Sequence, residues 1–158
     1  MKKGQDGAMA KGGLKMKTVA ELLKAKPARV VSVRPEQSVL EAIKVLAEED
    51  IGAAIVMTGG RLVGIFSERD YTRKIILKGR SSETTRVEEI MTPNVIVVNP
   101  RTKTRECMAL MTDRRIRHVP VVDGGEVMGI VSIGDVVKFK SKQQSFEIKY
   151  LTDYITSG

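Results

Sequence analysis

The chain has 158 residues, of which 42% are hydrophobic, and this suffices for one core or for two small intertwined units. No apolar run reaches the roughly 18 residues of a membrane span, and no apolar signal segment is visible near residue 1. Cys107 is the single cysteine, which excludes an internal disulfide and fits a reducing compartment. We therefore expect a cytoplasmic protein that does not associate with membranes.

The net charge of +8 is unevenly placed along the chain. Residues 1–17 hold five lysines and one aspartate, and so half of that charge, whereas both signs mix in the remainder. We expect residues 1–16 to form a disordered basic tail. With no Trp, three Phe and three Tyr, the chain has no aromatic platform for single-stranded bases, so nucleic acid is not the expected partner.

After the tail, residues 30–33 (VVSV) form a short apolar run before a proline, which predicts a strand. A helix is expected next, because Leu40, Ile43 and Leu46 recur at helical spacing. Two apolar runs, 54–57 and 62–66, then flank a pair of glycines, which indicates a β-hairpin. A second helix is expected after Asp70.

The second half of the chain repeats the first. Residues 35–70 and 100–135 are identical at ten of 36 positions without a gap. A weaker match upstream leaves three extra residues in the first copy, around residues 24–29. The repeat predicts a strand at 95–98, a helix with Met108 and Met111, a hairpin across Gly124-Gly125 and a last helix after Asp135. Each unit therefore reads strand–helix–strand–strand–helix.

We expect an α+β fold of two repeats, residues 17–80 and residues 84–140, that close on each other as one pair. Residues 141–158 have apolar residues at spacings of mainly three to five, which predicts a C-terminal helix or tail. That helix is expected to cover the core or to contact another subunit rather than a membrane.

The most specific signal is a motif that occurs in both copies, as GIFSERD (64–70) and GIVSIGD (129–135). A serine at the end of a strand with an aspartate three residues later matches a helix N-cap, which stabilises a helix by about 1 kcal/mol. The same residues suit a ligand site, because free amides at a helix start favour phosphate oxygens and an aspartate there can accept two ribose hydroxyls. Both interpretations stay open on the sequence.

The two copies carry different basic residues near the motif and the hairpin. Arg117 and His118 precede the hairpin of the second copy, where the first copy has Gly52 and Ala53, whereas Arg69 belongs to the first copy alone. Arginine suits phosphate because its planar fork offers paired donors. Unequal basic residues on a shared frame predict two pockets with different phosphate preferences.

These motifs resemble those of the cystathionine-β-synthase (CBS) domain, and two copies in register resemble a CBS pair, or Bateman module, of the stand-alone bacterial or organellar type. The resemblance covers about residues 18–140 and includes the RHVPVVD segment (117–123) and the IMTP segment (90–93). It implies two units packed through their small sheets about a pseudo-twofold axis. Two clefts at their interface would then bind AMP or NAD(H), or alternatively ADP, ATP or S-adenosylmethionine.

Carried over position by position, the resemblance implies one site around each motif aspartate. The residues expected in the Asp135 site are Ser32, Val33, Arg117, His118, Ile130, Ser132 and Asp135. The residues expected in the Asp70 site are Gly52, Ala53, Ile65, Ser67, Arg69, Asp70, Val95, Ile96 and Val97.

Catalysis is not expected. His118, the one histidine, has no evident nucleophile or orienting carboxylate, and one Cys with one His excludes zinc-ligand spacing. Neither a phosphate-binding GxxxxGK[ST] loop nor a dinucleotide GxGxxG motif is present. The sequence predicts a non-catalytic nucleotide sensor that forms a homodimer and signals to an effector protein. A scaffolding module with vestigial pockets is the main alternative, and a nucleic-acid binder that uses the basic tail is a third.

Overall fold

Each hairpin is built on a two-glycine turn, as predicted. In this computed structural model, which describes residues 17–26 and 29–142, β2 (Ala53–Thr58) pairs antiparallel with β3 (Arg61–Ser67), and β4 (His118–Asp123) with β5 (Glu126–Ser132). All four turn glycines have positive φ angles, between 56° and 84°. This left-handed backbone suits glycine, which has no Cβ to clash.

The first helix that was predicted in each repeat lies where the spacing of its apolar residues indicates. α3 (Val39–Glu49) begins at a capping box, in which the Ser38 hydroxyl accepts from the amide of Glu41 and the Glu41 carboxylate accepts from the amide of Ser38. Its counterpart α6 (Thr104–Arg114) ends, like α3, at a residue with left-handed backbone, Arg115. Both helices thus have defined ends.

The first strands of the two copies differ. In the first copy β1 (Ser32–Val33) runs parallel to β2 and completes a three-stranded sheet. The strand predicted at 95–98 is wrong: this segment forms only one parallel bridge, between Val98 and Val121, so the second sheet has two strands. The reason is Pro120. In the first copy the Ile55 amide donates to the Val31 carbonyl at 3.2 Å, and proline at the matching position has no N–H to donate.

The helix of each motif begins before its aspartate rather than after it. α4 (Glu68–Tyr71) starts at Glu68 and continues as a π-helical turn, η1 (Thr72–Ile76). The matching helix starts at residue 133 and is described to residue 142. Each aspartate is therefore the third residue of its helix, where its carboxylate can turn back to the serine.

The two copies exchange a helix. α2 (Val19–Ala25), at the start of the first repeat, packs into the core of the second unit, and α5 (Val87–Ile90), at the start of the second repeat, packs into the core of the first. The buried residues of the first core are Val33, Val39, Ala42, Leu46, Ala54, Val56, Phe66, Ile75, Val87 and Ile90. Those of the second are Val19, Leu22, Val98, Cys107, Met111, Val119, Val121, Val131 and Val136.

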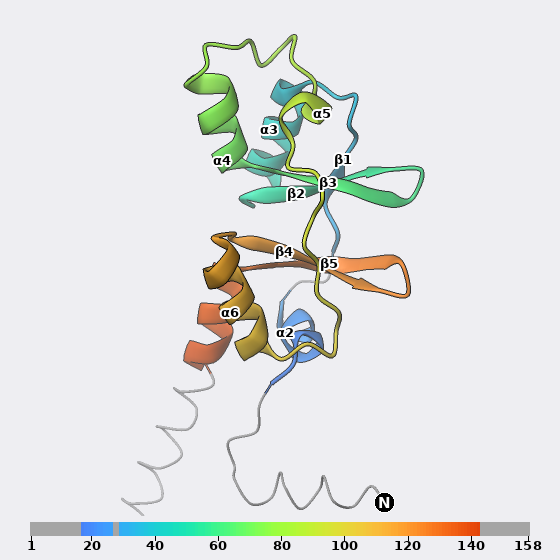
Figure 1. The fold of residues 1–158 in the computed structure, drawn as a ribbon, viewed down its shortest axis with the longest axis vertical. Coiled ribbons are helices and arrows are strands. Elements are labelled where there is room, and N and C mark those ends of the chain that lie inside the picture. The colour runs from blue at the N-terminus through green and yellow to red at the C-terminus, as the bar shows by residue number, and fades with distance from the viewer. Residues whose placement is uncertain (1–16, 27–28, 143–158) are drawn as a thin grey trace, which may run out of the picture.

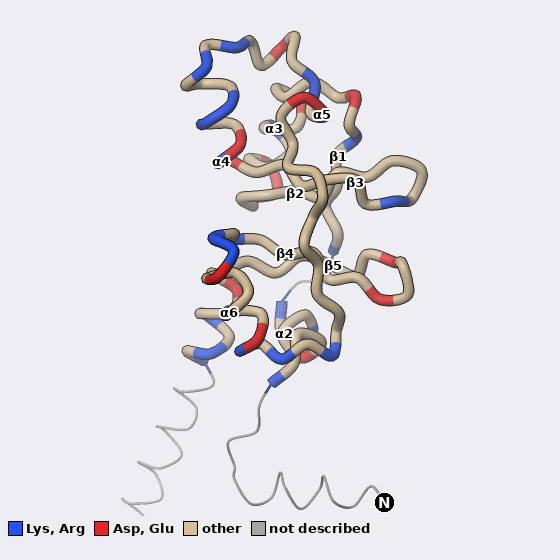
Figure 2. Tube along the Cα trace, viewed as in Figure 1, with Lys and Arg blue, Asp and Glu red and all other residues tan. Residues whose placement is uncertain are grey.

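The units are stacked with their sheets toward each other and their helices on the outer faces (Figure 1). This is the predicted α+β arrangement of two CBS-like units. Lysine and arginine are interspersed with aspartate and glutamate in both units (Figure 2). Among the described residues, no helix is both long enough and apolar enough to cross a membrane. The predictions for residues 1–16 and 143–158 lie outside the described part of the chain.

Candidate functional site

Ser67 and Asp70 cap α4 reciprocally. The Ser67 hydroxyl accepts from the amide of Asp70 at 3.1 Å, and the Asp70 Oδ2 atom accepts from the amide of Ser67 at 3.0 Å. The box forms because β3 delivers the serine in extended conformation just where the helix starts. The capping interpretation of the motif is therefore confirmed for the first copy.

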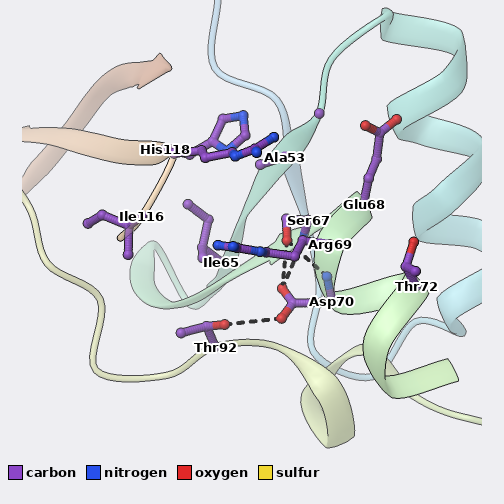
Figure 3. A pocket seen from close by; sticks show the side chains of 12 residues that line it. Ala53, Ile65, Ser67, Glu68, Arg69, Asp70, Thr72, Thr92, Ile116 and His118 are labelled. Atoms are coloured by element: carbon purple, nitrogen blue, oxygen red, sulfur yellow. Dashed lines mark hydrogen bonds between the residues drawn. The ribbon is translucent and has the colours of Figure 1, made fainter. Parts of the chain in front are cut away.

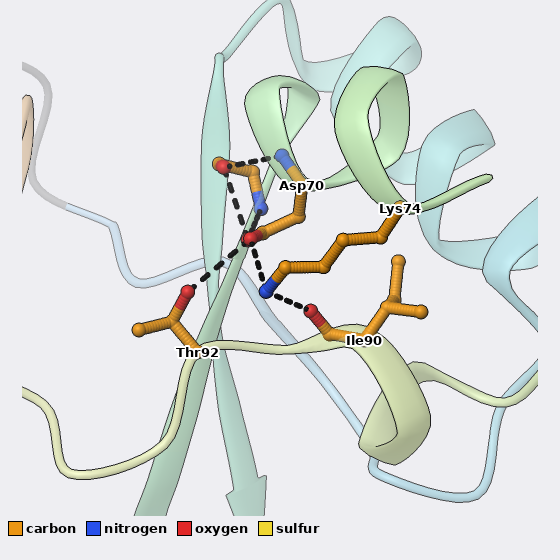
Figure 4. A network of polar contacts seen from close by, with 5 residues as sticks. Asp70, Lys74, Ile90 and Thr92 are labelled. Atoms are coloured by element: carbon orange, nitrogen blue, oxygen red, sulfur yellow. Dashed lines mark hydrogen bonds and ion pairs between the residues drawn. The ribbon is translucent and has the colours of Figure 1, made fainter. Parts of the chain in front are cut away.

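The other carboxylate oxygen of Asp70 is bonded as well (Figure 4). Its Oδ1 atom accepts from the Thr92 hydroxyl at 3.2 Å and pairs with the Lys74 ammonium at 3.0 Å. Lys74 also donates to the carbonyl of Ile90 at 2.9 Å. Only 7% of the surface of Asp70 is exposed. These bonds compensate for the cost of burying its charged carboxylate.

Asp70 borders a cavity of about 300 Å³ between the two units. Helix α4, strands β2 and β3 and the segment after α5 supply the side of the first unit, and the residues at the start of β4 supply the other side (Figure 3). The residues that line it are Gly52, Ala53, Ile65, Ser67, Glu68, Arg69, Asp70, Thr72, Thr92, Ile116, Arg117 and His118. Apolar, cationic and carboxylate groups thus meet in one cavity.

Gly52 gives this cavity part of its space. A Cβ atom at Gly52 would lie 3.4 Å from the Nε2 atom of His118 and 3.5 Å from the Oε1 atom of Glu68. Burial lowers the pKa of His118, and although Asp135 opposes this shift, the imidazole is neutral at pH 7. The cationic groups in the lining are therefore Arg69 and Arg117.

Arg69 connects the two units at the rim. Its guanidinium donates to the carbonyl of Arg115, at the left-handed end of α6, with a distance of 3.2 Å. The Arg69 side chain extends past Ile65 toward the same space as His118 (Figure 3). A phosphate in the cavity would therefore meet a guanidinium that already spans both units.

The structure gathers six residues of the expected Asp70 site in this cavity: Gly52, Ala53, Ile65, Ser67, Arg69 and Asp70. Val95, Ile96 and Val97 are not among its lining residues. Thr92 and Ile116 fill their place, because the backbone of Thr92 pairs with Ile65 on β3 and brings the end of the IMTP segment to the site.

Arg117 and His118 lie between the two motifs. The sequence placed them in the Asp135 site, and they also line the cavity of Asp70. The start of β4 faces the start of β2 across the two sheets, and this brings His118 next to Gly52. His118 also pairs with Ser132 on β5, and the Arg117 carbonyl accepts from the amide of Ile133, so both residues adjoin the Asp135 motif as well.

Asp135 has the same cap and a different neighbour. Its Oδ2 atom accepts from the Ser132 amide at 2.9 Å, and its own amide donates to the Ser132 hydroxyl at 2.9 Å. Oδ2 also pairs with the Lys26 ammonium at 2.7 Å. Burial raises the pKa of Asp135, but Lys26 and the Ser132 amide outweigh burial and hold the pKa below its ordinary value.

The cavity beside Asp135 is smaller, about 180 Å³, and lies between α2 and the helix that starts at residue 133. Its lining residues are Leu22, Ala25, Lys26, Asp135, Lys138, Phe139 and Lys142. Of the residues expected at this site, only Asp135 lines it. Val33 is instead buried in the first core, and Ser32 is exposed on β1.

Sequence reasoning missed several residues at the two aspartates: Glu68, Thr72, Lys74, Thr92 and Ile116 at Asp70, and Lys26 at Asp135. Lys26 had a usable signal, because it lies in the stretch where the first copy is three residues longer than the second. The described residues contain no cluster of three or more His, Cys, Asp or Glu side chains that could hold a metal ion.

Comparison with known proteins agrees with this geometry. The CBS domain family matches residues 19–77 and 87–142, well over half of the chain. The chain is 38% identical to the mitochondrial CBS domain-containing protein CBSX3 of Arabidopsis thaliana, over 98% of this chain and 79% of that protein.

Solved structures agree as well. A protein with CBS domains from Burkholderia ambifaria MC40-6 is 53% identical, with a TM-score of 0.75 over 77% of this chain and 92% of the other. The CBS domain pair of protein MJ0100, solved with 5-methylthioadenosine and S-adenosyl-L-methionine, is 26% identical, with a TM-score of 0.73 over 82% of this chain and 99% of the other. The chain belongs to the CBS-domain family and carries a tandem CBS pair.

Proposed function

We propose that this protein is a non-catalytic sensor of adenosine nucleotides, with AMP and NAD(H) as its first ligands and ADP, ATP or S-adenosylmethionine as further candidates. The observation that carries the proposal is the composition of the Asp70 cavity. A carboxylate at a helix start accepts ribose hydroxyls, Ile65 and Ile116 offer apolar contact to a flat base, and Arg69 and Arg117 supply phosphate donors. The ligands of the MJ0100 pair, which are adenosine compounds, support the same class.

The cavity draws on both units, which supports a signalling role. Asp70 and Ile65 come from the first copy, and Ile116, Arg117 and His118 come from the second. A ligand that contacts all of them favours one arrangement of the two units, by no more than its difference in affinity between arrangements. Binding, rather than turnover, is the expected activity, since the hydroxyls that pair with the Asp70 carboxylate, those of Ser67 and Thr92, belong to the cap and the polar network at the start of α4.

The effect on other proteins would pass through exposed surfaces. Ile76 and Val137 lie on the helices of the two motifs and Leu77 directly follows the first of them; 56%, 51% and 72% of their surfaces are exposed. We propose that these helices contact a second copy of the chain in a homodimer, which presents a ligand-dependent surface to an effector protein. Cytoplasm is the proposed location, although the Arabidopsis relative is named mitochondrial.

One observation favours the alternative, a scaffold with vestigial pockets. Both carboxylate oxygens of Asp70 already accept bonds from Ser67, Thr92 and Lys74, so the motif has a complete structural role. A ligand must therefore replace or share these bonds. The two functions differ in whether an adenosine compound binds at all.

A thermal-shift panel decides between them. Wild type, Asp70→Ala, Asp135→Ala and the exposed-surface control Asp113→Ala are heated with AMP, ADP, ATP, NAD, NADH or S-adenosylmethionine. A ligand at 100 times its Kd adds about 2.7 kcal/mol of stability. We expect at least one compound to stabilise wild type and Asp113→Ala, with the response reduced in Asp70→Ala.

A folded wild type that responds to none of the six compounds would support the scaffold instead. Sedimentation of the same samples tests the assembly. A species of only 17.4 kDa at micromolar concentration would contradict the homodimer.

A further inference from the structure

The Lys26 ammonium forms an ion pair with the Asp135 carboxylate. The ammonium lies 2.7 Å from the Oδ2 atom of Asp135 and donates to the carbonyl of Ile130 at 2.9 Å. The two side chains are 29% and 27% exposed, so the pair is partly desolvated. Lys26 also lines the cavity beside Asp135. A single side chain thus bridges the carboxylate and the strand next to it.

In the first copy, Thr92 makes the contacts that correspond to those of Lys26. Ile65 is the repeat equivalent of Ile130, and its carbonyl accepts from the amide of Thr92 at 2.9 Å. The Thr92 hydroxyl donates to Asp70 at 3.2 Å. Lys26 therefore makes with one ammonium the two contacts that Thr92 makes with its amide and its hydroxyl. A lysine side chain can leave by rotation about its own bonds, whereas Thr92 is held by strand pairing with Ile65.

Lys74 at Asp70 is not an equivalent competitor. It pairs with Asp70 at 3.0 Å with 42% of its side chain exposed, and its second contact is the carbonyl of Ile90 on α5. Lys74 is not among the residues that line the Asp70 cavity. Lys26, in contrast, lines the Asp135 cavity and binds the strand that leads to Ser132. Of these two lysines, Lys26 is the one that lines a cavity at its aspartate.

We propose that Lys26 is an internal competitor for ligand at Asp135 and makes this site the weaker of the two. The inference rests on the proposed nucleotide binding. A ribose that donates one hydroxyl to each oxygen of Asp135 needs Oδ2 as well as Oδ1. Oδ2 already accepts from Lys26 and Ser132, so the Lys26 ammonium must leave before this two-oxygen contact forms. The apparent affinity then falls by the fraction of molecules in which Asp135 is open.

The test is calorimetric titration with AMP in an Asp70→Asn background, which isolates the Asp135 site. In that background Lys26→Met keeps the length and apolar stem of the side chain but removes the ammonium. We expect it to tighten AMP binding about two- to fivefold, the range for release of one partly exposed ion pair. Lys26→Arg retains the pair and is expected to keep the weak affinity. Lys24→Met, an exposed lysine on the same helix, is the matched control.

The outcomes separate the two hypotheses. Unchanged or weaker AMP binding in Lys26→Met would overturn the competitor role, since the lysine would then be neutral or itself a ligand contact. Wild type, variants and control all failing to bind AMP or any other compound of the thermal-shift panel would refute the proposed function. Should the double variant not fold, as judged by its thermal melt, Lys26→Met alone is titrated and fitted to two sites. Tightening of the weaker site alone is then expected, and two unchanged affinities would overturn the proposal.

Discussion

At the scale of single residues, the repeated serine and aspartate have two compatible roles. They close the capping box that starts each helix, at distances of 2.9–3.1 Å in both copies. The same box fixes the carboxylate in one orientation at the border of a cavity. A stabilising cap thus positions an acceptor in advance, so that less side-chain freedom is lost when a ligand binds.

The motif glycines make a prediction that separates the two copies. A Cβ atom at Gly64 would lie 2.6 Å from the sulfur of Met91 and 3.1 Å from the carbonyl oxygen of Thr92, which is itself paired with β3. At Gly129 the nearest atom is a methyl group of Leu23 at 3.2 Å, and this side chain can move. We expect Gly64→Ala to lower the free energy of unfolding by about 1–3 kcal/mol, and Gly129→Ala by less than about 1 kcal/mol.

Urea unfolding of the two alanine variants measures this difference. Each variant is the control for the other, since both change the same motif position in repeat units of the same fold. Equal losses of stability, or a larger loss for Gly129→Ala, would contradict the backbone-contact explanation for Gly64.

At the scale of elements, the exchange of the short helices unites the two copies. α2 begins the first repeat, yet Val19 and Leu22 are buried among residues of the second unit. α5 does the same in reverse through Val87 and Ile90. Neither repeat therefore has a complete core of its own, and the units are expected to depend on each other for stability.

Leu22→Ala tests this exchange. Leu22 is 2% exposed, so the loss of its buried methyl groups should cost about 2–4 kcal/mol of unfolding free energy. Because α2 packs on the second unit, amide hydrogen exchange should accelerate more in β4 and β5 than in β2 and β3. Lys24→Ala, an exposed change on the same helix, should cost less than about 0.5 kcal/mol. An equal or greater acceleration of exchange in β2 and β3 would contradict the conclusion that α2 stabilises the second unit.

The sequence predicted local features well and long-range ones less well. The two-glycine hairpins and the helix around Leu46 depend on residues close together in the chain, and all were correct. The strand at 95–98 failed because Pro120, more than 20 residues away, removes a donor. The cavity position of Arg117 was also missed, since it depends on how the sheets of two copies face each other. Such pairings have no periodicity in the sequence.

At the scale of the whole molecule, His118 couples the two units. It begins β4 in the second unit, yet lies beside Gly52 of the first and lines the Asp70 cavity. Burial lowers the pKa of His118, the charge of Asp135 raises it, and the charges of Arg117 and Lys26 lower it further. Groups from both candidate sites thus act on one imidazole.

The pH dependence of stability follows from this position. The pKa of His118 is lower in the folded chain than the value of about 6.5 in the unfolded chain, so the unfolded state binds the proton more readily. Stability is therefore fully present above pH 6.5 and falls as the pH decreases through that value toward the folded pKa. His118 is the only histidine of the chain, so this pH window has one principal titrating side chain.

Urea unfolding at pH 7.5, 6.5 and 5.5 should show a decline in the free energy of unfolding of wild type that is smaller in His118→Gln. The same slope in both proteins would mean that other groups cause the decline, and a rise in wild-type stability toward pH 5.5 would reverse the sign of the His118 shift.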